Sequence, residues 1–187
     1  MRKKMGKRSN FERVERDYYP TPYHAFEPLI PHLPQKPFTF CEPCGGDGRL
    51  IDHIEKHLGI CDMASDIEPM DDRVSKKDAF DIDHVSSQLI ITNPPWDRKL
   101  LHRMIDHFSP MKPTWLLFDA EWPNTIQSIP YMEKCKKIVS IGRVMWFGGT
   151  NGKDSCAWYL FHDTPKVTPT EYWGRAPKKV ANLEKFL

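Results

Sequence analysis

The stretch that decides the fold is Phe38-Thr39-Phe40-Cys41-Glu42-Pro43-Cys44-Gly45-Gly46-Asp47-Gly48. Its first four residues are apolar or β-branched, which predicts a short buried strand, and the glycines that follow predict a tight turn. After the turn, apolar residues recur at helical spacing as Leu50, Ile51, Ile54 and Leu58, and Gly59 is placed to end a helix. The sequence therefore predicts one strand–turn–helix unit here.

The rest of the chain continues this alternation. Further strands are expected at residues 60–66, 89–92, 114–118, 138–146 and 155–162, and helices at 22–33, 98–108 and around 123–135. Alternating strands and helices predict an α/β fold whose sheet carries helices on both faces. The last two strands form a closing hairpin, which predicts one antiparallel edge strand. The last 20 residues show no clear pattern.

Composition indicates a globular chain of one domain. Of the 187 residues, 40% are hydrophobic and 28% are charged, and no apolar run approaches the ~18 residues of a membrane span. Residues 1–16 carry seven basic and two acidic side chains and read as a flexible basic arm, before a single domain at 17–187. Such an arm suits a nucleic-acid backbone, and it suits a merely solubilising tail equally well.

The five cysteines are odd in number and scattered, which predicts reduced thiols and a cytoplasmic location. Cys41 and Cys44 form a lone C-x-x-C with no second ligand pair, so no metal is expected. His53 and His57 are four residues apart, but the string His-Ile-Glu-Lys-His is not H-E-x-x-H. An exposed helix face is the expectation there.

Polar residues stand at the predicted strand ends, where ligands gather in an open α/β sheet. The glycine turn has neither the G-x-G-x-x-G pattern nor a P-loop lysine, and it carries Glu42 and Asp47, which would repel a phosphate. A cationic, phosphate-free ligand fits better, and S-adenosylmethionine is one. Asp66 is placed to accept from both ribose hydroxyls, and Asp78 from the adenine amino group.

Asn93-Pro94-Pro95-Trp96 follows the apolar strand at 89–92. Two prolines cannot continue a central strand or enter a helix, so they form a stiff ledge. The Asn93 side-chain oxygen and the Pro94 carbonyl can accept hydrogen bonds from a ring-conjugated amino group, and Trp96 can stack on that ring. The alternative is a rigid turn with a core tryptophan. Trp122 and Trp146 are the candidates for walls of such a pocket.

In these motifs the chain resembles the amino-group methyltransferases of the Rossmann-like class I fold, and more narrowly the DNA N6-adenine methyltransferases, including small phage-type ones. Motif I of that family reads here as Glu42-Pro43-Cys44-Gly45-Gly46-Asp47-Gly48, motif II as Asp66-Ile67, motif III as Asp78-Ala79-Phe80 and motif IV as Asn93-Pro94-Pro95-Trp96. Motif X corresponds to Tyr19-Pro20-Thr21-Pro22, which in the family covers the methionine end of the cofactor.

The resemblance covers roughly residues 18–162 and implies a mostly parallel seven-stranded sheet with one antiparallel strand in the C-terminal hairpin. It implies cofactor-binding residues Tyr19, Thr21, Pro22, Glu42, Pro43, Cys44, Gly45, Gly46, Asp66, Ile67, Asp78, Ala79 and Asn93. It implies catalytic residues Asn93, Pro94, Pro95 and Trp96. The implied reaction converts S-adenosylmethionine to S-adenosylhomocysteine while methylating adenine N6 in DNA by direct in-line transfer.

Two features leave alternatives open. RNA methylases and protein-glutamine methylases share motif IV, commonly with tyrosine in its last place. Trp96 weakly favours a nucleobase as the acceptor, and the basic arm weakly favours nucleic acid, so RNA and protein glutamine remain alternatives to DNA. We expect a single domain without a separate target-recognition domain, and recognition is then expected from Phe147–Asp154, from the chain ends or from a second subunit. A methyltransferase-like binding protein without turnover is the alternative outside enzymes, and the complete motif IV argues against it.

Overall fold

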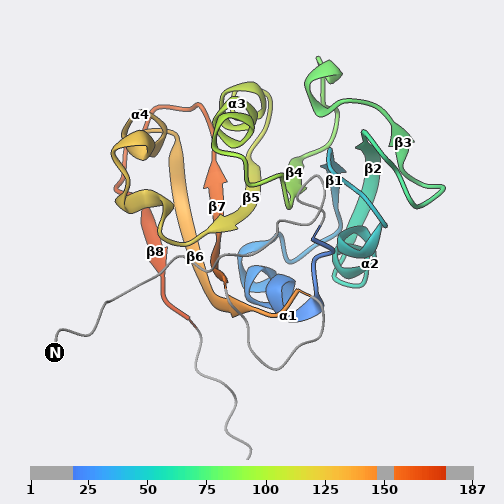
Figure 1. Cartoon of the computed structure of the whole chain (residues 1–187), viewed down its shortest axis with the longest axis horizontal. Coiled ribbons are helices and arrows are strands. Elements are labelled where there is room, and N and C mark those ends of the chain that lie inside the picture. Colours follow the sequence, from blue (N-terminus) through green and yellow to red (C-terminus); the bar gives the residue numbers. More distant parts are fainter. Residues whose placement is uncertain (1–18, 147–153, 176–187) are drawn as a thin grey trace, which may run out of the picture.

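The computed structural model describes residues 19–146 and 154–175. The predicted basic arm at 1–16 lies outside these residues, as does nearly all of the predicted recognition segment Phe147–Asp154, of which only Asp154 is described. The described part contains one sheet of eight strands in the order β3-β2-β1-β4-β5-β7-β6-β8, with β3 and β8 at its two ends (Figure 1). The expectation of seven strands was therefore one too few.

The strands follow the sequence pattern closely. They are β1 (Phe38–Glu42), β2 (Gly59–Asp66), β3 (Ser75–Lys76), β4 (Leu89–Thr92), β5 (Thr114–Asp119), β6 (Cys135–Val144), β7 (Asp154–Phe161) and β8 (Glu171–Trp173). Only β7 among them runs opposite to its neighbours, since it pairs antiparallel with both β5 and β6, whereas the other pairings are parallel. The prediction of one antiparallel strand in the hairpin is confirmed.

The hairpin pattern predicted that this antiparallel strand lies at the edge of the sheet, and that prediction was wrong. β7 lies between β5 and β6, and β6 in turn pairs with β8. The short strands β3 and β8 were not predicted, because two or three exposed residues show no alternation of apolar and polar side chains. β8 also contradicts the expectation that the last 20 residues hold no regular element.

The α-helices are α1 (Tyr23–Phe26), α2 (Arg49–Glu55), α3 (Arg98–Phe108) and α4 (Ile129–Met132), and the 3₁₀ turns are η2 (Glu27–His32), η3 (Ala79–Asp81), η4 (Trp122–Asn124) and η5 (Ile126–Ser128). The helix expected at 22–33 is divided into α1 and η2, in which Pro28 and Pro31 remove two backbone donors. The helix expected around 123–135 is likewise reduced to η4, η5 and a single turn of α4, because Pro123 and Pro130 interrupt it.

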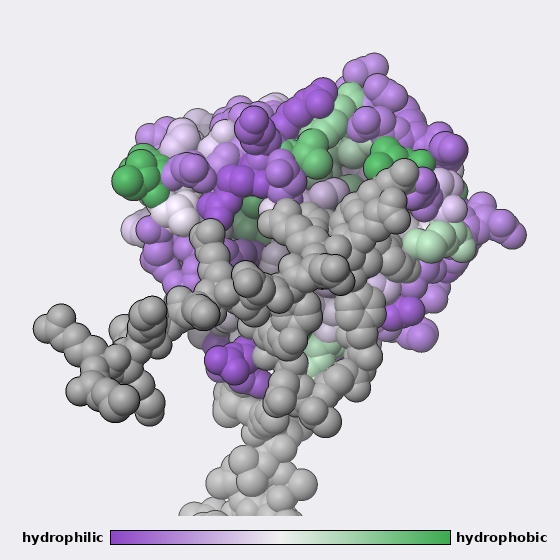
Figure 2. All heavy atoms as spheres, in the orientation of Figure 1, coloured by the Kyte–Doolittle hydropathy of each residue, from purple (hydrophilic) through white to green (hydrophobic). Residues whose placement is uncertain are grey.

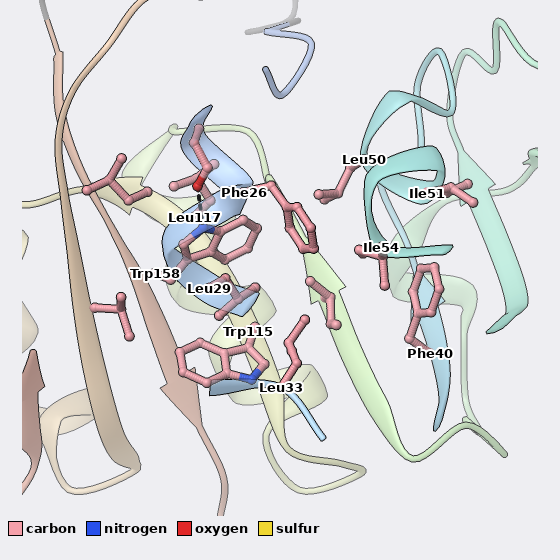
Figure 3. Close-up of a cluster of buried hydrophobic side chains, with 14 of the residues drawn as sticks. Phe26, Leu29, Leu33, Phe40, Leu50, Ile51, Ile54, Trp115, Leu117 and Trp158 are labelled. Carbon is pink, nitrogen blue, oxygen red and sulfur yellow. Dashed lines mark hydrogen bonds between the residues drawn. The ribbon is translucent and has the colours of Figure 1, made fainter. Parts of the chain in front are cut away.

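Helices cover both faces of the sheet, as alternating side chains on β5 show. Trp115 and Leu117 point into a core with α1, η2 and α2, which Figure 3 shows, and Leu116 and Phe118 point into a second core with α3. On the visible face in Figure 2, hydrophilic residues predominate and apolar ones form small separate patches. A third cluster, which includes Cys41, Ile90 and Phe108, packs β1 and β4 against α3. No helix in the described part of the chain is long and apolar enough to cross a membrane.

Two expectations around α2 were wrong. The helix ends at Glu55, and Leu58 is half exposed with a positive φ of 73°, so it does not extend the apolar face. His53 and His57 are half-buried rather than exposed, because their rings pack against Tyr23 and Phe26 of α1.

Candidate cofactor and acceptor site

A cavity of about 670 Å³ lies where β1, β2 and β4 end. Chain segments far apart in sequence meet around it: the approach to α1, the glycine turn, the loops after β2 and β3, the end of β4 and one face of α3. Its lining consists of Tyr19, Pro20, Thr21, Glu42, Pro43, Cys44, Gly45, Gly46, Asp47, Leu50, Asp66, Ile67, Glu68, Pro69, Met70, Asp78, Ala79, Phe80, Asn93, Pro95, Leu100 and Met104.

The glycine turn bends sharply over the end of β2. Gly46 and Gly48 have positive φ values of 48° and 74°, which glycine adopts without the steric cost of a Cβ. The backbone N–H of Gly46 donates to Asp66 Oδ2 at 3.0 Å, and the N–H of Glu68 donates to Asp66 Oδ1 at 2.8 Å. Asp66 therefore orders the turn, and each of its oxygens keeps a lone pair for a hydroxyl donor in the cavity.

Glu42 ends β1 with a fully buried side chain. Its Oε1 accepts the backbone N–H of Cys44 at 3.1 Å, and its buried Oε2 has no hydrogen-bond partner among the described residues. Burial raises the pKa of Glu42 to about 8, against the opposing effects of Thr92 and the Cys44 N–H. Glu42 is among the cavity-lining residues, so a cation that carries hydrogen-bond donors could satisfy this unpaired carboxyl oxygen.

Acidic side chains dominate the cavity, although the raised pKa of Glu42 means that this group becomes negative only as the pH approaches about 8. Five carboxyl groups contribute to the lining, and no lysine or arginine is among the lining residues described. Such a wall disfavours phosphate groups and favours a cation with hydroxyl donors. The ammonium, sulfonium and ribose hydroxyls of S-adenosylmethionine fit this set, with Glu42 for the ammonium and Asp66 for the hydroxyls. Asp78, which caps η3 by accepting the Phe80 N–H at 2.9 Å, also lines the cavity.

Asn93 follows β4 and lies half-buried at the cavity. Its Nδ2 donates to the backbone carbonyl of Tyr19 at 2.8 Å. Its Oδ1 is buried and has no hydrogen-bond partner among the described residues. The amide is thus held by its donor end, while the hydrogen-bonding capacity of its acceptor end is not used by the described residues.

Trp96 is fixed at the other end of the ledge. Its indole Nε1 donates to the Leu117 carbonyl of β5 at 3.1 Å, and its ring lies edge-on to that of Trp146, with centroids 5.7 Å apart. Trp96 and the buried Pro94 are not among the residues that line the cavity, whereas Asn93 and Pro95 are. The predicted acceptor motif is therefore divided between the cavity wall and the packing behind it.

The predicted cofactor residues are brought together with one exception. Pro22 is outside the lining and serves as the N-cap residue of α1. Trp122 is also elsewhere, fully buried under α3 with its Nε1 donating to His102 Nε2 at 3.0 Å, so it forms no wall of this cavity.

Sequence reasoning missed several residues of the cavity wall. They are Pro20, Leu50, Glu68, Pro69, Met70, Phe80, Leu100 and Met104. Phe80 adjoins Asp78-Ala79, which was a usable signal. Leu100 and Met104 share one side of α3 at i, i+4, but that spacing indicates core packing as readily as a cavity wall.

Comparisons with known proteins bear on the fold. No family model matches the chain, and no curated protein matches it. Among solved structures, similar ones include a Listeria monocytogenes protein assigned to the class I S-adenosylmethionine-dependent methyltransferases, with a TM-score of 0.50 and 10% identity over 83% of this chain and 63% of that one. A dimethyladenosine transferase from Plasmodium falciparum has a TM-score of 0.53 and 16% identity, over 76% and 62% of the two chains.

A third similar structure is the methyltransferase subunit of a type I restriction-modification system from Streptococcus thermophilus, with a TM-score of 0.50 and 11% identity over 80% of this chain and 45% of that one. The chain spans less than two thirds of the length of these three proteins. The likenesses show the α/β Rossmann-like methyltransferase fold, as the sequence predicted.

Proposed function

We propose that this protein is an S-adenosylmethionine-dependent methyltransferase that methylates the exocyclic N6 amino group of adenine in DNA. The observation that carries the proposal is the state of Asn93. Its Nδ2 is engaged by the Tyr19 carbonyl at 2.8 Å, and its buried Oδ1 is left without a partner beside a cavity suited to the cofactor. A site that offers acceptors and withholds donors selects a substrate group rich in N–H.

The chemistry follows from the needs of a ring-conjugated amine. Its lone pair is delocalised into the ring, which makes the nitrogen a poor nucleophile. Asn93 Oδ1 and the Pro94 carbonyl would accept its two N–H groups, favour tetrahedral nitrogen and aim the lone pair at the incoming carbon. S-adenosylmethionine supplies a methyl group on a sulfonium sulfur, which departs as a neutral thioether. The Asn93 amide cannot act as a base. The methylated amino nitrogen would therefore release its extra proton to water after the N–C bond has formed.

Adenine in DNA is favoured over the other planar amines on three counts. The motif order from Tyr19 to Trp96 resembles the N6-adenine methyltransferases, and Trp96 replaces the tyrosine common in protein-glutamine methylases. Residues 1–16 are strongly basic, which suits a polyanion. Two proteins of the same fold are, by their names, a dimethyladenosine transferase and a restriction-modification methyltransferase subunit. The adenine would have to leave the base stack to enter the site. The free energy needed for this is lowest in single-stranded DNA.

The test is transfer of labelled methyl from S-adenosylmethionine to single- and double-stranded DNA, RNA and protein, with the modified atom identified by mass spectrometry. N6-methyladenine in DNA is the expected product. Asn93→Ala should lower kcat by about 10²–10³-fold, as loss of one preorganised hydrogen-bonding group does. The exposed Asn124→Ala serves as the matched control and should keep full activity.

Each other outcome contradicts a definite part of the proposal. If methyl is transferred only to RNA or to protein glutamine, the proposed substrate is wrong, while the proposed role of Asn93 is unaffected. Cofactor binding without transfer to any acceptor would support a binding protein that lacks turnover. An Asn93→Ala variant with undiminished kcat would remove the mechanism itself.

A further inference from the structure

Three aromatic rings connect the segment before α1 with residues 93–96, which we call the acceptor loop. Trp146, two residues beyond the end of β6, has its ring centroid 5.5 Å from that of Tyr19 and 5.7 Å from that of Trp96. Trp146 is only 8% exposed, and it is not among the residues that line the cavity. Its ring therefore packs against both the cavity-lining Tyr19 and the Trp96 that follows Asn93, without itself lining the cavity.

The contact with Tyr19 bears directly on Asn93. Tyr19 precedes Pro20, and a residue before proline is restricted to extended backbone conformations. With the backbone restricted and the side chain packed against Trp146, the direction of the Tyr19 carbonyl is set. That carbonyl receives the Asn93 Nδ2 hydrogen bond.

The orientation of the Asn93 amide decides whether the site can bind an amino group. Rotated by half a turn about its last side-chain bond, the amide would direct Oδ1 at the Tyr19 carbonyl, so that two acceptors would face each other. Nδ2 would then occupy the position from which Oδ1 meets the substrate, and two donors would face each other there. The Tyr19 carbonyl excludes this arrangement as long as it stays in place.

We propose that Trp146 is a positioning residue that holds the Asn93 amide, through Tyr19, in the orientation that accepts an amino group. This role differs from stacking on the substrate, because Trp146 packs against Trp96 and is not among the cavity-lining residues. The value of this role for methyl transfer rests on the proposed function, while the effect on the amide exists in the free protein.

The free protein gives the first test. In a ¹⁵N–¹H correlation spectrum, the side-chain NH₂ pair of Asn93 is identified as the pair lost in Asn93→Asp. Trp146→Ala, and Trp146→Leu as a bulkier second variant, should shift this pair toward the position of an exposed asparagine amide and speed its exchange with water. Trp146→Phe, which keeps a ring, should retain the wild-type signal.

Trp173→Ala is the matched control, since Trp173 is half exposed on β8 and is not among the cavity-lining residues. Its Asn93 pair should stay in place. Backbone amide signals outside the site show that each variant is folded. An Asn93 pair that is unchanged in folded Trp146→Ala or Trp146→Leu would overturn the proposal.

Turnover gives the second test, as a double-mutant cycle. Trp146→Ala should lower kcat about tenfold in the wild-type background and less than about twofold when Asn93 is already alanine, because the two residues act as one unit. Another tenfold loss in the Asn93→Ala background would contradict the proposal and indicate direct contact with substrate. If the wild-type protein methylates nothing, the proposed function fails, and the spectra still decide the role of Trp146.

Discussion

Replacing Glu42 with glutamine removes a buried carboxyl group whose proton the folded protein holds over a wider pH range than the unfolded chain does. Burial raises the pKa of this group from 4.5 to about 8. Between these values the folded protein keeps the proton and the unfolded chain has lost it. Raising the pH therefore favours the unfolded chain, and the free energy of unfolding falls as the pH rises from about 4.5 to about 8.

The size of this effect follows from the pKa difference. One unit of pKa corresponds to about 1.4 kcal/mol, so a gap of about 3.5 units lowers the free energy of unfolding by at most about 5 kcal/mol. In Glu42→Gln this contribution is absent. Stability should thus fall less steeply with pH in the variant than in the wild type, whatever constant cost the amide itself brings.

Urea unfolding of both proteins at pH 5, 6, 7 and 8 measures the two slopes. The difference between them isolates Glu42, because the other titrating groups are common to both proteins. The same variant should bind S-adenosylhomocysteine weakly and with little pH dependence. The wild type should gain affinity about tenfold per pH unit from pH 6 to near 8, since a ligand ammonium selects ionised Glu42. Parallel stability slopes would refute the assignment of a protonated, buried Glu42.

Three further substitutions separate support of the fold from binding. Gly48→Ala should destabilise the protein by about 1–3 kcal/mol in urea unfolding, because φ is +74° at this position and the new Cβ would lie 2.5 Å from Asp71 Oδ2. Gly174→Ala is the control and should leave the stability unchanged, since no atom lies within 4 Å of the added Cβ. Equal stabilities of the two variants would contradict this prediction. Asp66→Ala should weaken S-adenosylhomocysteine binding at least about tenfold by calorimetry, and wild-type affinity would show that Asp66 does not serve the cavity. Trp122→Phe should lose about 1–2 kcal/mol of stability with the bond to His102 but keep kcat per folded molecule, and a fall in kcat would place Trp122 at the acceptor site after all.

The sequence was informative wherever one local signal determined the structure. The strand at Leu89–Thr92 and the helix at Arg98–Phe108 have the predicted bounds, because the apolar run, the two prolines after it and the apolar spacing of the helix all agree there. The continuous helix expected around 123–135 is absent, because Pro123 and Pro130 remove backbone donors that such a helix needs. The edge position expected for β7 failed because strand order is a long-range property that a hairpin pattern does not contain.

The site shows the same division. Strand-end carboxylates such as Asp66 were visible in sequence because their positions relative to the strands are local. The hydrogen bond that orients Asn93 was not, since it joins residues 74 positions apart through a backbone carbonyl. The contact of Trp146 with Tyr19 was invisible for the same reason. Local chemistry could thus suggest which residues react, while the restraint of those residues emerged only from packing.

The reversed direction of β7 has a consequence for how such a protein could acquire new targets. Since β6 runs parallel to β5 and β7 runs against both, the end of β6 and the start of β7 lie at the same edge of the sheet as Asn93. Residues inserted between Trp146 and Asp154 would begin next to Trp96, whose ring centroid is 5.7 Å from that of Trp146, and would leave the strand pairing unchanged. Under the proposed function, this connection is the place where a different target-recognition segment could be exchanged without changing the residues that line the cavity.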